Sequence, residues 1–269
     1  MKRTKRVLGL ALAAVMCVGL LAGCGGNPSS SDTADDASGA ETSEKVLNIA
    51  TIGETTTLSP LYMIADNRPT QKLLYEGLVK YVDGEIQPVL AEDWELSEDG
   101  TQLTFYLRQG VTFHDGEPFN AEAAIANIES WHINPSFASL PGVVNYTSIE
   151  AVDEYTIRLT YDTPYFAYIN DFCWPDVCTM ISPKLITQGD FQTVNGYAGT
   201  GPYIYDEYVA GQYTTFVRNE NYWGEQPYYD KIVAKYIPDN ASRVQALQTG
   251  EIDLIYGSAE LSYEDYNQA

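Results

Sequence analysis

The feature that most constrains the fold of this chain is its first 24 residues, which are marked for processing rather than for packing. Four cations among the first six residues precede an apolar run from Val7 to Leu21. A run of 15 residues is short for a helix that spans a membrane, whereas it is typical of the apolar core of a secretion signal. We therefore assign residues 1–23 to a signal peptide, and only the remainder can build a domain.

The residues that close this signal also predict an anchor. Leu21-Ala22-Gly23-Cys24 resembles the bacterial lipobox, in which the cysteine is diacylated and becomes the first residue of the mature chain. Two acyl chains are enough for stable attachment to a membrane. Residues 24–45 are rich in Ser, Gly and Asp without apolar periodicity, so they read as a flexible tether. The sequence predicts an extracytoplasmic protein, lipid-anchored at the outer face of the cytoplasmic membrane or in the periplasm.

Composition excludes one class of partner and permits a large core. The 269 residues carry 37 acidic and 15 basic side chains, which give a formal net charge of −22. Nucleic-acid binding rests on neutralising phosphates with a basic surface, and no such surface is expected here. Apolar residues make up 45% of the sequence, and the length suits one large or two smaller domains. We expect an acidic globular protein that does not bind nucleic acid.

Strand-like and helix-like segments alternate along residues 46–257. Leu103–Arg108 alternates between the two faces of a strand, and Asn120 is a good N-cap for a helix over residues 121–130. The apolar spacing in residues 70–81 also favours a helix, although Gly77 weakens that prediction and is a candidate end for the helix. No internal repeat is visible. The mixture predicts an α/β or α+β fold.

Signatures of catalysis and of metal binding are missing from the sequence. It contains no Gly-x-Ser-x-Gly, no His-Glu-x-x-His and no Gly-rich phosphate loop. Its two histidines, His114 and His132, are isolated, whereas a metal site needs clustered ligands at suitable spacing. His114 belongs to an HDGEPF turn, where a structural role is expected. We predict a protein that is not an enzyme and that needs neither a metal nor a cofactor.

Two cysteines, Cys173 and Cys178, remain once Cys17 leaves with the signal and Cys24 receives lipid. On an extended strand these two would lie too far apart to bridge. A turn at Pro175-Asp176 would bring them together as a disulfide, which export to an oxidising compartment permits. The alternative is a pair of unpaired thiols.

Four stretches of the chain carry a recognisable pattern. They are LLYEGLVKY at 73–81, the block at 86–123, the block at 199–239, and SRVQALQTGEIDL at 242–254. Their glycines and prolines, as in GTGPY at 199–203, suit turns that hold a scaffold. Together and in this order, the four stretches resemble the family 5 bacterial extracellular solute-binding proteins, which are the oligopeptide, dipeptide and nickel binders of ABC importers.

This resemblance implies a two-lobed fold of the type II periplasmic-binding-protein kind, with ligand captured between the lobes by hinge closure. Lobe I would contain a sheet subdomain from residues 46–75 and 186–257, with an inserted subdomain at 76–185. Residues 258–269 would begin the hinge and lobe II. Full members of the family run to roughly twice this length, so the rest of lobe II is expected to be absent. Half a cleft should bind ligand weakly or not at all.

The ligand is expected to be a short peptide, with a nickel chelate or another solute as alternatives. The segments at 217–225 and 253–268 look closest to the nickel-binding branch, but Asp176 stands where that branch places an arginine. Arg68 suits a ligand carboxylate and Asp176 suits an amine, as in a zwitterionic peptide. Aromatic candidates would enclose the ligand. The candidate ligand-binding residues are Tyr62, Met63, Arg68, Trp131, His132, Trp174 and Asp176.

The function that these features predict is capture of short peptides outside the membrane. A monomeric lipoprotein would deliver them to an ABC permease and its ATPase subunits. Two rivals of another class are a surface lipoprotein without a transport role and an inactive truncated fragment.

Overall fold

The computed structural model describes most of the chain beyond the tether. Three of the predicted functional residues, Cys24, Met63 and Asp176, lie outside the described residues. Within the part that is described, no helix is long and apolar enough to cross a membrane. The described residues are 44–62, 68–174, 177–186 and 196–256.

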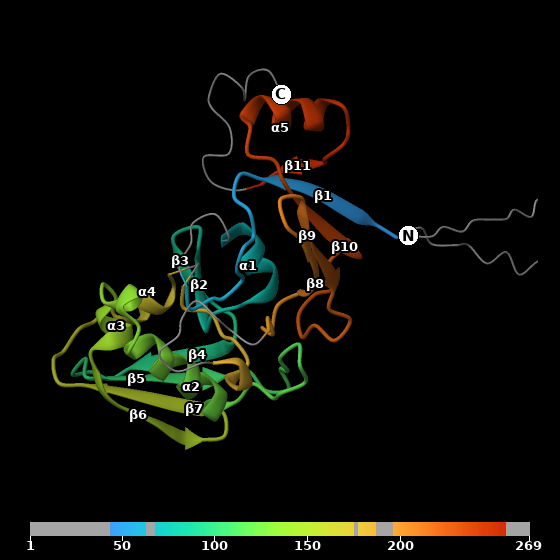
Figure 1. Ribbon diagram of the computed structural model, residues 1–269. Helices are drawn as coiled ribbons and strands as arrows, with labels where there is room; N and C mark the ends of the chain where they lie inside the picture. The colour runs from blue at the N-terminus through green and yellow to red at the C-terminus, as the bar shows by residue number, and fades with distance from the viewer. Residues whose placement is uncertain (1–43, 63–67, 175–176, 187–195, 257–269) are drawn as a thin grey trace, which may run out of the picture. The chain divides into compact units, whose positions relative to one another are not determined.

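A five-stranded sheet joins the two ends of the described chain (Figure 1). Its order is β11 (Leu254–Ile255), β1 (Val46–Thr51), β10 (Lys231–Tyr236), β9 (Tyr213–Arg218) and β8 (Tyr203–Val209). β1 runs parallel to β10 and β11, whereas β8, β9 and β10 are antiparallel neighbours. Because β1 pairs with a strand near the other end of the chain, the segment between them must leave this sheet and return to it.

Helices pack on both faces of the five-stranded sheet. Ile49 and Ala50 are neighbours in β1, so their side chains point to opposite faces. Ile49 belongs to a buried cluster with the last residue of α1 (Arg68–Leu74). Ala50 belongs to another cluster with Ala246 of α5 (Asn240–Gln248). The sheet is therefore buried on both sides along β1.

A second, four-stranded sheet is antiparallel throughout. Its order is β4 (Ala91–Leu96), β5 (Gln102–Leu107), β7 (Thr156–Tyr161) and β6 (Tyr146–Asp153). The expected strand at 103–108 is confirmed as β5, one residue earlier than predicted. Its alternate apolar side chains are buried as the pattern requires.

Helix α2 (Ala121–His132) packs against this second sheet and confirms the helix expected there. The side chain of Asn120 accepts a hydrogen bond from the backbone N–H of Ala123, so it caps the helix as predicted. Ile128 and Trp131 lie in the same buried cluster as the inward residues of β5. Short helices follow at η2 (Pro135–Phe137), α3 (Pro141–Val144), α4 (Tyr168–Phe172) and η3 (Pro183–Leu185).

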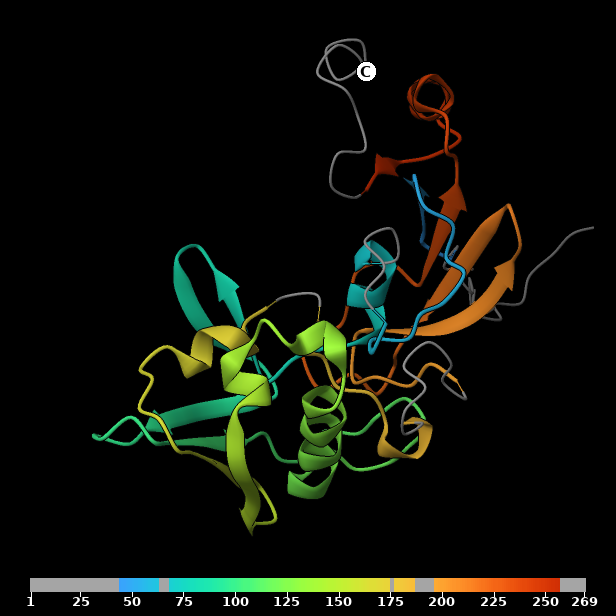
Figure 2. The same cartoon turned by 60° about the vertical axis from the view of Figure 1, so that its left-hand side comes forward.

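The helix expected over residues 70–81 is wrong in its second half. α1 ends at Leu74, and a hairpin of β2 (Val79–Val82) and β3 (Glu85–Pro88) follows it. Asp83 and Gly84 have φ of 52° and 89°, as a two-residue hairpin turn requires. Figure 2 shows this hairpin standing apart from the four-stranded sheet. The turn chemistry has therefore overridden the helical spacing.

The two sheets draw on different parts of the sequence. β1 and β8 to β11 come from residues 46–51 and 203–255, whereas β4 to β7 lie within residues 91–161. The subdomain boundaries that the resemblance implies, at residues 75 and 185, stay a prediction.

Candidate functional site

Trp131 is a core residue. Its side chain has no exposed surface, and its ring stacks on Phe137 at a centroid distance of 5.8 Å. No part of this ring is open to a ligand in the structure. His132, the next residue, is exposed and lies against Tyr146 with ring centroids 4.6 Å apart.

Leu61, in the loop that follows β1, meets the segment after α2. The side-chain amide of Asn134 donates a hydrogen bond to the carbonyl of Leu61 at 2.8 Å. Tyr62 is half-buried beside this contact. The fold thus brings Tyr62 near the end of α2, whereas it turns Trp131 inward, and the cleft role of both residues stays a prediction.

Helix α1 carries two cations one turn apart. Arg68 is its first residue and Lys72 lies four positions on, so both project from the same face of the helix. Arg68 is half-buried and Lys72 is exposed. Lys72 lines a hollow of about 270 Å³ together with Trp174, another of the predicted ligand residues. α1 and Trp174 therefore lie side by side although they are far apart in the sequence.

Two exposed aromatic side chains dominate this hollow. Trp174 keeps 48% of its surface exposed and Tyr81, from β2, keeps 58%. The same pair lines a neighbouring hollow of about 380 Å³ with Asn170 and Cys173. We call these two hollows together the Trp174 groove. Its first hollow is also lined by Lys72, Glu76, Lys80 and Thr179.

Glu76 lines the groove and also anchors two other segments. Its Oε1 accepts a hydrogen bond from the hydroxyl of Tyr222 at 2.7 Å. Its Oε2 accepts from the indole Nε1 of Trp223 at 2.7 Å and from the hydroxyl of Thr200 at 2.9 Å. Three donors from the 200 and 222–223 segments therefore converge on one carboxylate beside the groove.

The first hollow of the groove is lined by one carboxylate and two ammonium groups. Burial raises the pKa of Glu76, while its three hydrogen bonds and the charge of Lys80 oppose that rise. The hydrogen bonds occupy the carboxylate from the protein side, whereas the side chains of Lys72 and Lys80 are exposed. The groove therefore turns two cations toward solvent in a chain whose net charge is −22.

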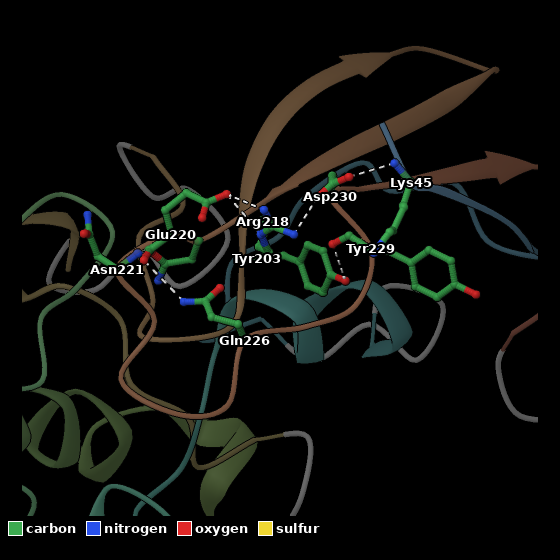
Figure 3. Close-up of polar contacts among 9 residues, drawn as sticks. Lys45, Tyr203, Arg218, Glu220, Asn221, Gln226, Tyr229 and Asp230 are labelled. Atoms are coloured by element: carbon green, nitrogen blue, oxygen red, sulfur yellow. Dashed lines mark hydrogen bonds and ion pairs between the residues drawn. The ribbon is translucent and has the colours of Figure 1, made fainter. Parts of the chain in front are cut away.

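The segment that reaches Glu76 is fixed at its own base (Figure 3). Arg218 at the end of β9 forms ion pairs with Glu220, at 2.9 Å, and with Asp230. Asp230 also accepts a hydrogen bond from the backbone N–H of Lys45, just before β1, at 2.7 Å. The loop over residues 219–230 is thus closed at its base and held by Glu76 farther along.

His114 has the structural role expected of it. Its Nδ1 accepts a hydrogen bond from the backbone N–H of Gly199 at 3.3 Å, so Nε2 carries the proton that is donated to the carbonyl of Gly201 at 2.9 Å. Burial lowers the pKa of His114, which favours this neutral form. Across the described residues no group of three or more His, Cys, Asp or Glu side chains is placed to hold a metal ion.

Cys173 and Cys178 are unpaired thiols in the structure. Their Sγ atoms contact the carbonyl oxygens of Ile169 and Asp171, each at 3.4 Å. Burial raises the pKa of both thiols, that of Cys173 to about 11, so neither is a reactive thiolate at neutral pH. Of the two alternatives that the sequence leaves open, the structure has the pair without a bridge.

Non-reducing alkylation tests this assignment. We expect iodoacetamide to modify Cys173 and Cys178 fully in guanidinium and slowly in buffer, because folding buries both thiols. Peptide mass mapping measures each site separately. A peptide that joins the two residues through a disulfide would contradict the assignment.

Sequence reasoning missed Lys72, Glu76, Lys80 and Tyr81. All four lie within residues 70–81, where the sequence predicts a helix and no ligand-binding residue. The signal that separates them is Gly77, whose added Cβ would lie 2.7 Å from the carbonyl oxygen of Cys178. The chain turns from helix to strand at this glycine, and Tyr81 moves next to Trp174 as a result.

Comparisons with known proteins agree with this fold. The family model for the bacterial extracellular solute-binding proteins, family 5 middle, matches residues 85–269. A nickel-binding periplasmic protein of Escherichia coli K12 is 38% identical over 76% of this chain and 40% of its own length. A glutathione-binding protein of Pectobacterium atrosepticum is 34% identical over 77% of this chain and 41% of its own length. The chain thus spans about 40% of the length of these curated relatives.

A solved structure gives the same result. The crystal structure of NikA from Brucella suis in complex with Fe(III)-EDTA matches with a TM-score of 0.77 and 34% identity, over 84% of this chain and 46% of that one. The mixed α/β architecture is accordingly that of the type II periplasmic binding proteins. This chain belongs to family 5 of the bacterial extracellular solute-binding proteins.

Proposed function

We propose that this protein is the solute-binding lipoprotein of an ABC importer. The lipid on Cys24 holds it outside the membrane, and it passes its ligand as a monomer to a permease with its ATPase subunits. Family membership supports the transport role, and the signal with its Leu-Ala-Gly-Cys end supports the anchor. The protein binds and releases its solute without chemical change.

The proposed ligand is a short peptide, and the observation that carries this proposal is the Trp174 groove. Lys72 and Lys80 suit the carboxylates of a peptide, since charge-assisted hydrogen bonds are among the stronger ones available. Trp174 and Tyr81 offer apolar faces to its side chains. Both hollows are lined by these two rings, and two adjoining hollows suit an elongated ligand. The glutathione-binding relative supports this choice, since glutathione is a tripeptide with two carboxylates.

A nickel chelate is the second candidate, and similarity favours it. The Escherichia coli relative is named for nickel, and the Brucella suis structure holds an iron chelate. A chelate offers carboxylates to the same lysines while its own atoms coordinate the metal, so the protein needs no ligand cluster. Both candidates therefore use the same cations, and only direct binding separates them.

Calorimetric titration of the full-length protein tests the proposal. The titrants are glutathione, pools of di- to pentapeptides, and nickel with an excess of histidine. For the titrant that binds, we expect Trp174→Ala and Lys80→Gln each to weaken binding by about tenfold, because each removes a contact of the groove. Two matched variants serve as controls: Tyr228→Ala removes an exposed aromatic elsewhere, and Lys235→Gln removes a cation that pairs with Glu251.

Peptide binding with these losses supports peptide import, and binding of the nickel–histidine mixture alone reverses the ranking of the two ligands. Equal losses in the control variants would place the ligand outside the groove. A folded protein that binds none of the titrants would mean that neither a short peptide nor a nickel chelate is the ligand.

A further inference from the structure

A separate hollow of about 310 Å³ lies between α3 and the loop that joins β7 to α4. These elements are neighbours in the four-stranded part of the fold (Figure 1). The hollow shares no lining residue with the Trp174 groove. Its walls are formed mainly by Pro141, Asn145, Asp162, Pro164, Tyr165 and Tyr168.

The loop that forms one wall is held in place before any ligand arrives. The hydroxyl of Tyr168 donates a hydrogen bond to the carbonyl of Thr163 and so closes the loop on itself. The backbone N–H of Tyr165 donates to the carbonyl of Gly100 at 3.1 Å, which ties the loop to the turn between β4 and β5. Tyr161 stacks on Tyr168 with ring centroids 3.7 Å apart. A ligand would therefore lose little affinity to ordering this wall.

The charge of the hollow is unbalanced. Asp162 is exposed, and its carboxylate makes no hydrogen bond or ion pair with any residue that the structure describes. The side chain of Asn145 likewise leaves its amide carbonyl available, because only its backbone is used in the turn after α3. No cation lines the hollow to neutralise Asp162. The Asp162 carboxylate and the Asn145 carbonyl thus line a hollow that contains no cationic side chain.

The remaining walls are apolar and aromatic. Tyr165 keeps 40% of its surface exposed, and it meets Tyr168 at 77° with ring centroids 4.9 Å apart. Pro141 and Pro164 add rigid apolar surface. An aromatic ring attracts a cation over its face, and a neighbouring carboxylate attracts the same charge. Asp162 repels anions here, whereas two lysines line the Trp174 groove.

We propose that this hollow is a second binding site, which takes a small organic cation with a flat or apolar body. The ammonium or amidinium head donates hydrogen bonds to Asp162 and to the side-chain carbonyl of Asn145. The body packs against Tyr165 and the two prolines. A net charge of −22 concentrates cations around the protein and adds to the occupancy of the site at low salt. The site does not depend on the identity of the imported solute.

Benzamidine is the probe, and benzamide, its neutral isostere, is the control ligand. We expect benzamidine to shift the backbone ¹⁵N–¹H correlation signals of residues 142–145, 162–163 and 165–168 in the full-length protein, and benzamide to leave them unchanged. Asp162→Asn should weaken benzamidine binding by about tenfold, because it removes the charge of the acceptor. Tyr165→Ala should weaken it about threefold through the lost ring. Glu225→Gln removes an exposed acid of the loop over residues 219–230, which lines no part of the hollow, and should change the binding less than about twofold.

Three results would overturn the proposal. Absence of any shift with benzamidine at about 10 mM would mean that the hollow does not bind organic cations at affinities typical of weak sites. Equal binding of benzamide would show an apolar pocket without preference for charge. Equal losses in Asp162→Asn and Glu225→Gln would show that the general field of the protein, and not this site, attracts the probe.

Discussion

Replacing Glu76 with alanine is expected to lower the free energy of unfolding by about 3 kcal/mol, because three donors lose one shared acceptor. Tyr222 and Trp223 are half-buried, so water can replace the lost acceptor of their hydroxyl and indole N–H only in part. The loop over residues 219–230 would lose its contact beside the groove. Urea unfolding followed by far-ultraviolet circular dichroism measures the change.

Glu76→Gln is the matched variant for this prediction. Glutamine has nearly the same shape, and its carbonyl can replace Oε2 as acceptor for Trp223 and Thr200. The Tyr222 hydroxyl can turn and accept a hydrogen bond from the new amide. We expect a loss of less than about 1 kcal/mol. If alanine and glutamine cost the same, the convergence of donors on this carboxylate does not stabilise the fold.

Wild type and Glu76→Gln also show how the charge of Glu76 makes the free energy of unfolding depend on pH. Burial raises the pKa of Glu76 in the folded state, whereas in the unfolded state the side chain titrates at about pH 4.3. Between these two pKa values the folded state binds more protons than the unfolded state. Stability from this group therefore falls as pH rises through that window and is level above it. Carboxylates with lowered pKa values, such as Asp230, act in the opposite direction. The difference between wild type and Glu76→Gln isolates Glu76, and a difference that is flat with pH would contradict the assignment.

Local signals explain which parts of the fold the sequence could predict. β5 and α2 carry their own periodicity, and Asn120 carries its own cap, so neighbours along the chain are enough to define them. Residues 70–81 have the apolar spacing of a helix, whereas the turn at Asp83-Gly84 just beyond them favours a hairpin. The residues between can join only one of the two elements. The chain resolves this competition at Gly77, where the backbone passes close to Cys178. That contact is far away in the sequence and leaves no periodic signal.

At the candidate site, too, local sequence does not predict which single residues are buried. Trp131 and Trp174 are both aromatic residues in polar surroundings of the sequence, yet one is fully buried and the other is 48% exposed. Trp131 lies one position before the end of α2, on the face that meets the sheet, whereas Trp174 follows the end of α4. Which face of a short helix is covered depends on elements far along the chain. Lys72 and Lys80 become neighbours of Trp174 for that reason alone.

Substitution of Gly199 is expected to have a second large effect, because the backbone at Gly199 passes directly over the end of α1. A Cβ at residue 199 would lie 2.0 Å from the carbonyl oxygen of Leu74 and 2.5 Å from Cδ1 of Tyr75. Neither can move cheaply, since Leu74 and Tyr75 are buried and the Leu74 carbonyl already accepts a hydrogen bond from the N–H of Gly201. We expect Gly199→Ala to lower the free energy of unfolding by about 3 kcal/mol or more, or to prevent folding.

Gly116→Ala distinguishes this close approach from an ordinary effect of glycine on the backbone. Gly116 has φ of 85° and nothing within 4 Å of its added Cβ, so alanine there is strained only by its backbone angle. That strain should cost about 1 kcal/mol. Urea unfolding of both variants gives the comparison. A much larger loss at residue 199 would show that the end of α1, and with it the wall of the Trp174 groove, is positioned by the chain that crosses it. Similar losses at the two sites would mean that α1 can shift to make room, and that its position beside the groove is not fixed by this contact.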